Sequence, residues 1–432
     1  MKAAFLALAL ALGFPAVAQA QAFAGTWDVA VREAGGRNYY LPMTDGRLLI
    51  ESGGQSARYN ALSFTGRMAP DGLHLACMAA GKPCGTLVLQ QAGNRLSGSG
   101  ILIDSDGLER PVTLEGMPPA PRRAPRSFDF TPTQFHNVFS GAIAPALHLQ
   151  PGDTVNTSTL DSRGFDRDGR PRAPRGNPLT GPFYIDGAMP GDTLVVHLDR
   201  VRLNRDTAYQ SNLIAAPALE ADYLQSLAAL PPGFSRWKID TAAGTASLVD
   251  PGARMAGYSV RLSPMLGCVG VAPPREEVLR STHLGPFGGN MDSPEVREGV
   301  TLYLPVFQPG ALLFVGDGHA RQGDGELPGQ GLETSMDVSF RVDLIPGRAL
   351  AQPRLENDDT MMVMGTGPTL DAAMKSATTQ MSRWLAETYG LTPQDIAALL
   401  GTAIQYQIAE VVDPEFNVVA RIGKAELAKL RR

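Results

Sequence analysis

Short apolar runs separated by turn residues fill the first 120 positions of the chain. Segments such as GTWDVAV, RLLIES, LHLACMA, GTLVLQQ and PVTLEG alternate apolar with polar positions and are separated by Gly, Asp or Asn. Alternation with a period of two, interrupted at regular intervals by turn residues, is typical of antiparallel strands. The pattern predicts a small antiparallel barrel or sandwich over residues 21–117 and an extended, Pro- and Arg-rich linker over residues 118–127.

The strand-like pattern continues from Phe128 to Ile345 and contains three turns of one form. In each turn a Pro-Gly pair follows one strand pattern and precedes the next. Pro presets φ at the second turn position and Gly accepts the positive φ of the third, so we expect type II turns. The turns are at Pro151–Thr154, Pro190–Thr193 and Pro309–Leu312. The pattern predicts a β-rich body within residues 128–432.

The period changes to that of a helix after residue 369. Thr369 is a suitable N-cap and Gly390 a suitable end for the first helix, and Thr392-Pro393 opens a second one. One face of the first helix is expected to carry Leu370, Ala373, Met374, Ala377, Met381, Trp384 and Leu385. We therefore expect a mainly β protein: a β-rich body with a C-terminal helical hairpin, preceded by a small antiparallel β domain.

Composition and charge narrow the class of protein. The chain has 432 residues, of which 44% are hydrophobic and 19% charged, which favours a folded globular protein over a disordered one. Lys plus Arg number 38 and Asp plus Glu number 43, giving a formal net charge of −5. An acidic balance of this kind disfavours non-specific binding to nucleic acid, so no nucleic-acid partner is expected.

The N-terminus has the pattern of a secretory signal. Lys2 precedes a short apolar run and an A-Q-A site, so residues 1–20 are interpreted as a signal peptide and the protein as periplasmic or secreted. No later window is apolar enough to span a membrane. In an oxidising compartment Cys77 and Cys84 are close enough in sequence to bridge a hairpin, while Cys268 is expected to remain a free, structural thiol.

The densest group of chemically useful side chains is GDGHARQGDGE, residues 316–326. Asp317 and His319 are two positions apart, so in an extended strand they leave the same face and point at one ligand; Asp324 and Glu326 repeat that spacing. Such a group suits a cation or acid–base catalysis. A solvated acidic turn is the alternative interpretation of this segment.

Other candidates lie at the ends of strand patterns. Asn290 and Asp292 follow paired glycines, although Asp292 could equally cap a turn before Ser293-Pro294. His136, Asp161 and Asp186 each lead into or lie in a Gly-rich loop, which makes a shared cleft plausible. The chain lacks the G-x-S-x-G, H-E-x-x-H, Walker and Rossmann signatures, which removes the usual support for serine-hydrolase, zincin and nucleotide-binding functions.

These same segments resemble the acetamidase/formamidase family. The resemblance rests on QFHNVFSG, GPFYIDGAMPGDTL, GGNMDSPEV, GDGHARQGDGE, MSRWLAETYGL and QIAEVVDP, and covers about residues 128–427. It implies a β-rich fold with a helical C-terminal part, hydrolysis of short linear amides to a carboxylate and ammonia, and a divalent metal, zinc or calcium. It also leaves a homo-oligomer possible. The signal-like start, the extra β domain and an Arg-rich loop with Arg163, Arg167, Arg170 and Arg172 are departures from the family pattern.

The resemblance marks these positions as functional candidates, and we assign each a role as a hypothesis. Glu326 is the expected general base, with His136, Asn290 and Asp292 as further catalytic candidates. The expected metal ligands are Asp161, Asp186, Asp317 and His319. The leading hypothesis is a metal-assisted amidohydrolase; the alternatives are a metal-independent carboxylate hydrolase acting on a larger or anionic amide, and a secreted binding protein without catalysis on the same fold.

Overall fold

The computed structural model describes residues 23–34, 45–59, 62–79, 82–104, 106–119, 121–275 and 277–430. The predicted signal peptide, residues 1–20, lies outside these ranges. The chain divides into two compact units, Met1–Ala120 and Pro121–Arg432. In the described part of the chain, no helix is both long enough and apolar enough to cross a membrane.

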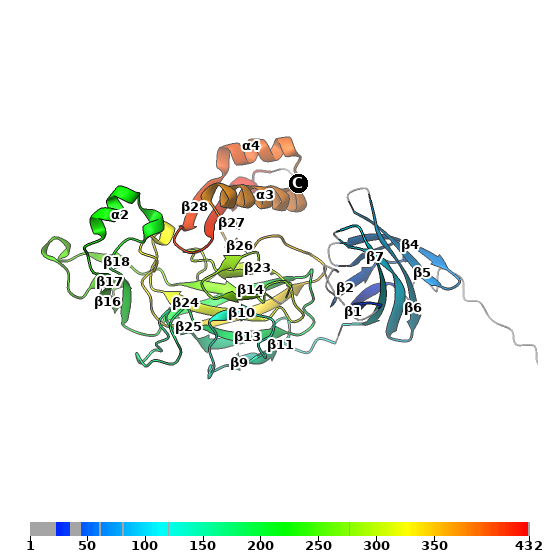
Figure 1. Cartoon of the computed structure of the whole chain (residues 1–432), viewed down its shortest axis with the longest axis horizontal. Coiled ribbons are helices and arrows are strands. Elements are labelled where there is room, and N and C mark those ends of the chain that lie inside the picture. Colours follow the sequence, from blue (N-terminus) through cyan, green and yellow to red (C-terminus); the bar gives the residue numbers. More distant parts are fainter. Residues whose placement is uncertain are drawn as a thin grey trace, which may run out of the picture. The chain divides into compact units, whose positions relative to one another are not determined.

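The first unit is a closed antiparallel barrel in which every strand pairs with the next and the last strand pairs with the first (Figure 1). The strands are β1 Gly25–Glu33, β2 Asp45–Ile50, β3 Ser56–Tyr59, β4 Leu62–Ala69, β5 Gly72–Ala79, β6 Lys82–Ala92, β7 Arg95–Ile103 and β8 Glu109–Met117. Alternate residues of these strands are buried in one apolar core, as the period-two pattern requires. The predicted small antiparallel β domain is confirmed, and of the two predicted forms it is a barrel and not a sandwich.

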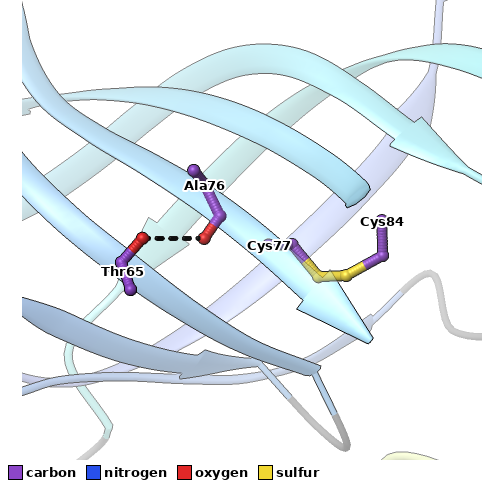
Figure 2. The surroundings of a disulfide bond; sticks show 4 residues. All are labelled: Thr65, Ala76, Cys77 and Cys84. Atoms are coloured by element: carbon purple, nitrogen blue, oxygen red, sulfur yellow. Dashed lines mark hydrogen bonds between the residues drawn. A yellow bond between two sulfur atoms is a disulfide. The ribbon is translucent and has the colours of Figure 1, made fainter. Parts of the chain in front are cut away.

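A disulfide joins Cys77 on β5 to Cys84 on β6 (Figure 2). The two strands are antiparallel neighbours, so the bridge closes a hairpin of the barrel. Cys268 is free and buried. The structure thus confirms the pairing that the spacing of the three cysteines suggested.

The second unit is built on two sheets that share one hydrophobic core. The larger has the order β28-β29-β27-β26-β23-β14-β25-β12-β9. Its strands are β9 Ser127–Asp129, β12 Thr154–Ser158, β14 Thr193–Leu203, β23 Thr301–Pro305, β25 Met336–Ile345, β26 Arg354–Glu356, β27 Thr360–Gly367, β28 Gln405–Glu410 and β29 Phe416–Gly423. Strand β25 alternates buried and half-buried residues throughout, so one face of this sheet covers the core.

The smaller sheet has the order β11-β13-β24-β19-β22-β21 and carries most of the candidate site. Its strands are β11 Leu147–Leu149, β13 Leu179–Ile185, β19 Met265–Gly270, β21 Leu284–Gly285, β22 Gly288–Asn290 and β24 Leu313–His319. Phe183, Phe314 and Phe340 join the two sheets in the core. Strands β19 and β24 are buried along their whole length, which is why they read as continuous apolar runs.

Three predicted Pro-Gly turns link these strands as expected. Gly152, Gly191 and Gly310 have φ of 96°, 89° and 77°. In each turn the backbone N–H two residues after Pro donates to the carbonyl of the residue before Pro, at 2.9, 3.0 and 2.9 Å. Positive φ at the third position with this hydrogen bond is the type II geometry.

Smaller elements complete the unit. A two-stranded sheet pairs β10 with β20, and a four-stranded sheet has the order β15-β16-β17-β18. The bounds are β10 Val138–Ser140, β15 Thr207–Ser211, β16 Phe234–Asp240, β17 Thr245–Leu248, β18 Ser259–Arg261 and β20 Val278–Arg280, with helices α2 Ala221–Leu227, α3 Leu370–Tyr389, α4 Pro393–Ala403, α5 Lys424–Leu427 and the short 3₁₀ turns η1 Ala216–Ala218, η2 Ala253–Met255 and η3 Asp324–Glu326.

The predicted helical hairpin is confirmed as α3 and α4. Thr369 accepts a hydrogen bond from the backbone of Ala372, and Gly390 ends α3 in the left-handed conformation. Thr392 and Asp395 form a capping box at the start of α4. Two residues of the predicted apolar face of α3, Leu370 and Met374, are exposed. The first buried residue of the helix is Ala373.

Candidate active site

The candidate site is a buried group of one imidazole and four carboxylates, which we call the buried acidic cluster: Asp292, Asp317, His319, Glu326 and Glu333. Their side chains meet from four separate segments. Strand β24 supplies two members at its C-terminal end, the segment after β22 supplies Asp292, the turn η3 supplies Glu326, and Glu333 pairs through its backbone with both β24 and β15. The loop GDGHARQGDGE is therefore not a solvated turn, since most of it is buried.

The side chains in the cluster lie within reach of one another. The Nε2 atom of His319 is 3.0 Å from Oε1 of Glu333, 3.7 Å from Oδ1 of Asp317 and 4.0 Å from Oδ1 of Asp292. Two sets of donor atoms each fit within 4.8 Å: Asp292, Asp317 and His319, and His319, Glu326 and Glu333. The predicted approach of Asp317 and His319 on one strand face is observed.

Several of these atoms are buried without a hydrogen-bond partner. They are Oδ1 of Asp292, Oδ1 of Asp317, Nε2 of His319 and Oε2 of Glu333. The short contact between His319 and Glu333 lacks hydrogen-bond geometry, so it leaves Nε2 on this list. Buried polar atoms are ordinarily paired, and a set that converges without partners needs an explanation such as a bound ion.

The electrostatics of the cluster favour a positive charge inside it. Burial raises the pKa of Asp292, Glu326 and Glu333, that of Glu333 to about 7, and neighbouring carboxylates add to each rise. Burial alone would lower the pKa of His319, but Glu333 and Asp317 raise it well above its usual range. Because the field that holds a proton on the imidazole also attracts a cation, the site suits a bound positive ion.

Gln322 fixes which nitrogen of His319 faces the cluster. The side-chain amide of Gln322 donates to the backbone carbonyls of Asp292 at 2.5 Å and Ala409 at 3.1 Å. Its Oε1 must then accept, and it lies 2.9 Å from Nδ1 of His319. Nδ1 therefore carries a proton in either charge state of the ring, and Nε2 faces the carboxylates as the nitrogen that would bind a metal ion in place of its proton.

Room for two of the carboxylates comes from a missing side chain. A Cβ on Gly267 of β19 would lie 2.3 Å from Oδ1 of Asp292 and 2.6 Å from Oδ2 of Asp317. Strand β19 pairs with β24 on both sides of this point but not at it. The glycine thus leaves the space in which the two carboxylates converge.

A network of amides holds the cluster from the other side. The side-chain amide of Asn290 donates to Asp292 and to Asp413, and its Oδ1 accepts from Asn177 at 3.0 Å and from the Cys268 thiol at 2.8 Å. Asn177 also donates to Oδ2 of Asp317, at 2.8 Å. Because all its donors and acceptors are engaged, Asn290 orients its neighbours and is a positioning residue.

Backbone conformation also marks this region. Among described non-glycine residues, positive φ occurs at Asn177 (51°), Arg275 (55°), Asp292 (37°), Ala311 (56°), Leu312 (60°), Asp317 (57°) and Glu326 (46°). Four of these seven belong to the cluster or contact it. Each left-handed residue costs about 1–3 kcal/mol, and such strain concentrates at functional sites.

Several predicted site residues lie outside the cluster. Asp161 is buried in an ion pair with Arg205 and accepts two backbone hydrogen bonds from its own loop. Asp186 is partly exposed and pairs with His148 at 3.1 Å. Neither is among the grouped donor atoms. A carboxylate at a strand end has several possible partners, and the sequence pattern does not distinguish a ligand from an ion-pair residue.

His136 and Asp324 are two further departures. The backbone of His136 pairs with Leu179, and its half-buried ring contacts Phe314 edge-on at 6.4 Å, so it is not grouped with the cluster. Burial lowers the pKa of His136. Asp324 is exposed and accepts from Gln407, because η3 replaces the extended segment that was expected. Only Glu326 turns inward.

Sequence reasoning missed three residues of the site. Glu333 lies in G-L-E-T-S just before β25, where a lone carboxylate precedes a strand pattern. Asp413 lies in the EVVDP segment, which supports the family resemblance, but it was not among the predicted site residues. Asn177 lies at the end of the Arg-rich loop, where the sequence does not distinguish it from the other polar residues.

The arginines of that loop are mostly paired. Arg167 pairs with Asp337, Arg170 with Asp168 at 3.8 Å and Arg172 with Asp166 at 3.5 Å. Arg163 instead lies against the rings of Phe165, Tyr209 and Phe234, at 5.5, 5.1 and 4.8 Å from their centroids. All four arginines are therefore engaged within the protein, three with carboxylates and Arg163 with aromatic rings.

Comparison with known proteins agrees with this site and fold. A model of the Acetamidase/Formamidase family matches residues 285–424, a range that includes all five members of the buried acidic cluster. An acetamidase from Yersinia enterocolitica is 28% identical, with a TM-score of 0.62, over 71% of this chain and 94% of that one. An acetamidase from Bacillus halodurans is 28% identical, with a TM-score of 0.60, over 71% of this chain and 100% of that one.

A relative from Schizosaccharomyces pombe that bears the name "Putative formamidase" is 26% identical over 250 residues, 44% of this chain. The match spans 59% of that protein's length. The β-rich fold is that of the solved acetamidases, and the resemblance to the acetamidase/formamidase family is confirmed.

Proposed function

We propose that the protein is an amidohydrolase that cleaves a short linear amide to a carboxylate and ammonia at the buried acidic cluster. The observation that carries the proposal is the convergence of Asp292, Asp317 and His319, each with an unpartnered buried atom facing the others. The relatives named above are acetamidases and a formamidase, which supports an amide as the substrate.

The donor set fits a divalent metal. Asp292, Asp317 and His319 would hold it, with Glu333 beside the imidazole; one nitrogen and several carboxylate oxygens suit zinc, and the oxygens alone suit calcium. When bound, such an ion polarises a carbonyl oxygen and lowers the pKa of a coordinated water.

The protein's own groups supply proton transfer and orientation. Burial raises the pKa of Glu326, which makes its carboxylate a stronger base than an exposed one. Glu326 accepts the proton of the attacking water and returns it to the departing nitrogen. Gln322 keeps Nε2 of His319 directed inward, and Asn290 holds Asp292 in place.

Cys268 is not the nucleophile in this proposal. Burial raises the pKa of its thiol well above the usual range, and the charges of Asp317 and Asp292 raise it further. A nucleophilic cysteine needs a base or cation that stabilises the thiolate. Here the thiol donates to Asn290 Oδ1, 2.8 Å away, and serves packing and positioning.

Metal analysis combined with amide turnover tests the proposal. The purified protein should hold about one divalent ion per chain and release ammonia from formamide, acetamide or a longer amide, and chelation should abolish turnover. His319→Ala should lose both metal and turnover, whereas Glu326→Gln should keep metal and lose turnover by about 10²-fold or more. Asp324→Asn, on the same loop but exposed, should change neither.

The alternatives predict different results. Full turnover in metal-free protein would establish the metal-independent hydrolase instead. Absence of turnover on every amide, in protein that holds its metal, would favour the binding protein without catalysis.

A further inference from the structure

The second unit contains a cavity beside the larger sheet, and none of the residues of the buried acidic cluster lines it. It has a volume of about 390 Å³ and is bounded by the ends of β14 and β25, by β23, β26 and β27, and by helix α3. Small-molecule sites are commonly about 300–1,000 Å³. The residues used in the argument below are Tyr303, Arg348, Arg354, Glu356, Trp384 and Lys424.

Two arginines of this cavity share one carboxylate oxygen. The guanidinium of Arg354 donates to Oε2 of Glu387 at 3.1 Å, and that of Arg348 donates to the same atom at 3.3 Å. Arg354 is only 4% exposed, and burial lowers the pKa of its guanidinium. A guanidinium has five N–H donors, so both forks keep donors beyond the one that each gives to Glu387.

The other carboxylate at the cavity is already satisfied. Glu356 pairs with Lys424 at 2.9 Å through Oε2 and accepts from the Tyr303 hydroxyl at 2.5 Å through Oε1. Three cations therefore face two carboxylates, and the surplus positive charge lies at the arginine pair. An anion at the donors of Arg348 and Arg354 that Glu387 leaves free would offset this charge without displacing Glu356 or Glu387.

One wall of the cavity is aromatic. The guanidinium carbon of Arg354 lies 5.0 Å from the ring centroid of Trp384, whose ring meets that of Tyr303 at 6.2 Å in an edge-on contact. Leu350 and Met361 add apolar surface to the lining. A ligand that fits this wall is flat or apolar at one end and negatively charged at the other.

We propose that this cavity is a second ligand site, separate from the buried acidic cluster, that binds a small organic carboxylate with a flat apolar body. Its carboxylate accepts from the guanidinium donors of Arg348 and Arg354 that Glu387 leaves free, because planar guanidinium groups match carboxylate geometry. Its body packs against Trp384 and Tyr303. The site does not depend on the proposed amidase activity.

Benzoate titration of the full mature protein, followed by tryptophan fluorescence and calorimetry, tests the proposal. We expect saturable benzoate binding. Arg348→Ala, at a half-exposed position, should weaken this binding at least tenfold, and Trp384→Phe should remove the fluorescence change that accompanies it. Benzamide, the neutral analogue, and inorganic phosphate, an anion without an apolar body, should bind at least tenfold more weakly. Arg383→Ala, an exposed arginine on the same helix, is the matched control and should bind benzoate normally.

Two further measurements separate this site from the cluster. Since benzoate resembles a carboxylate product, His319→Ala must retain the Arg348-dependent binding, and Arg348→Ala must retain amide turnover. The proposal is overturned if benzoate does not bind at about 10 mM, if Arg348→Ala and Arg383→Ala bind it equally, or if binding vanishes in His319→Ala.

Discussion

At the scale of single residues, the site depends on side chains and backbones in unfavourable states. Asp292, Asp317 and Glu326 have positive φ, and their carboxylates are buried beside one another. The absence of a side chain at Gly267 is as important as any charge, because the converging oxygens occupy the space its Cβ would fill. Adding or replacing a few atoms here should therefore change function strongly.

Gly267→Ala should abolish most turnover while leaving the fold intact. The added Cβ would lie 2.3 Å from Asp292 and 2.6 Å from Asp317, so both carboxylates must move apart. We expect amide turnover to fall by about 10²-fold or more, with weaker metal binding, since misplaced catalytic groups lose that much. Gly252→Ala, where a Cβ meets nothing within 4 Å, is the control. Normal turnover in folded Gly267→Ala would contradict this account of the site.

Asp292→Asn should stabilise the metal-free protein. The substitution keeps the acceptor for Asn290 and removes a carboxyl whose pKa is raised by burial and by Glu326 and Asp317. Relief of about 1–2 kcal/mol corresponds to a rise in melting temperature of about 2–6 °C in chelated protein. Metal binding and turnover should fall in the same variant. Thermal unfolding with and without chelator measures both effects, and a lower melting temperature in the chelated variant would count against like-charge repulsion.

At the scale of elements, the segment after β28 closes the site from the C-terminal side. Glu410 ends the strand, accepts from the backbone of Val412 and Asp413, and so shapes the loop that brings Asp413 to Asn290. Burial, followed by the charge of Asp413, raises the pKa of Glu410 to about 8. The folded state thus binds this proton more tightly than the unfolded chain does.

The sign of the resulting pH effect follows from linkage. A raised pKa stabilises the folded state fully below the unfolded value near 4.5, and this stabilisation is lost as pH rises through about 8. Glu410→Gln should remove this part of the decline, which is on the order of a few kcal/mol at most. Denaturant unfolding between pH 5 and about 9 is the measurement, with Glu426→Gln, at a partly exposed position, as control. Parallel pH profiles for wild type and Glu410→Gln would refute the assignment.

The elements also show which patterns can be read locally. Both limits of α3 and the start of α4 were predicted because Thr369, Gly390 and Thr392 act within one turn of their own position. The extended conformation expected for Asp324 and Glu326 was wrong, because positive φ at Gly325 and Glu326 folds the segment into η3. Gly325 makes such a turn possible, and the hydrogen bond from Gln407 on β28 to Asp324 stabilises it.

At the scale of the whole molecule, the barrel and the β-rich body are separate compact units with separate cores. The disulfide between Cys77 and Cys84 belongs to the barrel, and such bonds persist in oxidising compartments. Together with the signal-like start of the sequence, this supports the proposal that the protein is exported to the periplasm or secreted after removal of residues 1–20.

Protein isolated from the cell envelope should begin at Gln21, as intact-mass measurement would show. Cys77 and Cys84 should resist alkylation in denatured protein until a reductant is added, while Cys268 should react on denaturation alone. A cytoplasmic chain that retains Met1 would refute export. Labelling of all three cysteines without reductant would refute the bridge.

The sequence by itself determined what depends on neighbours along the chain. Alternation defined the strands of the barrel, Pro-Gly pairs defined three turns, caps defined two helices, and the two-residue spacing of Asp317 and His319 placed them on one strand face. Only the tertiary structure decided which polar residues meet. Glu333 joins the cluster, and Asn177 and Asp413 contact its network, through pairings between distant segments. Asp161 and Asp186 pair with Arg205 and His148 instead. A carboxylate carries no local signal of its partner, because burial and the charges around it are fixed only when the sheets pack.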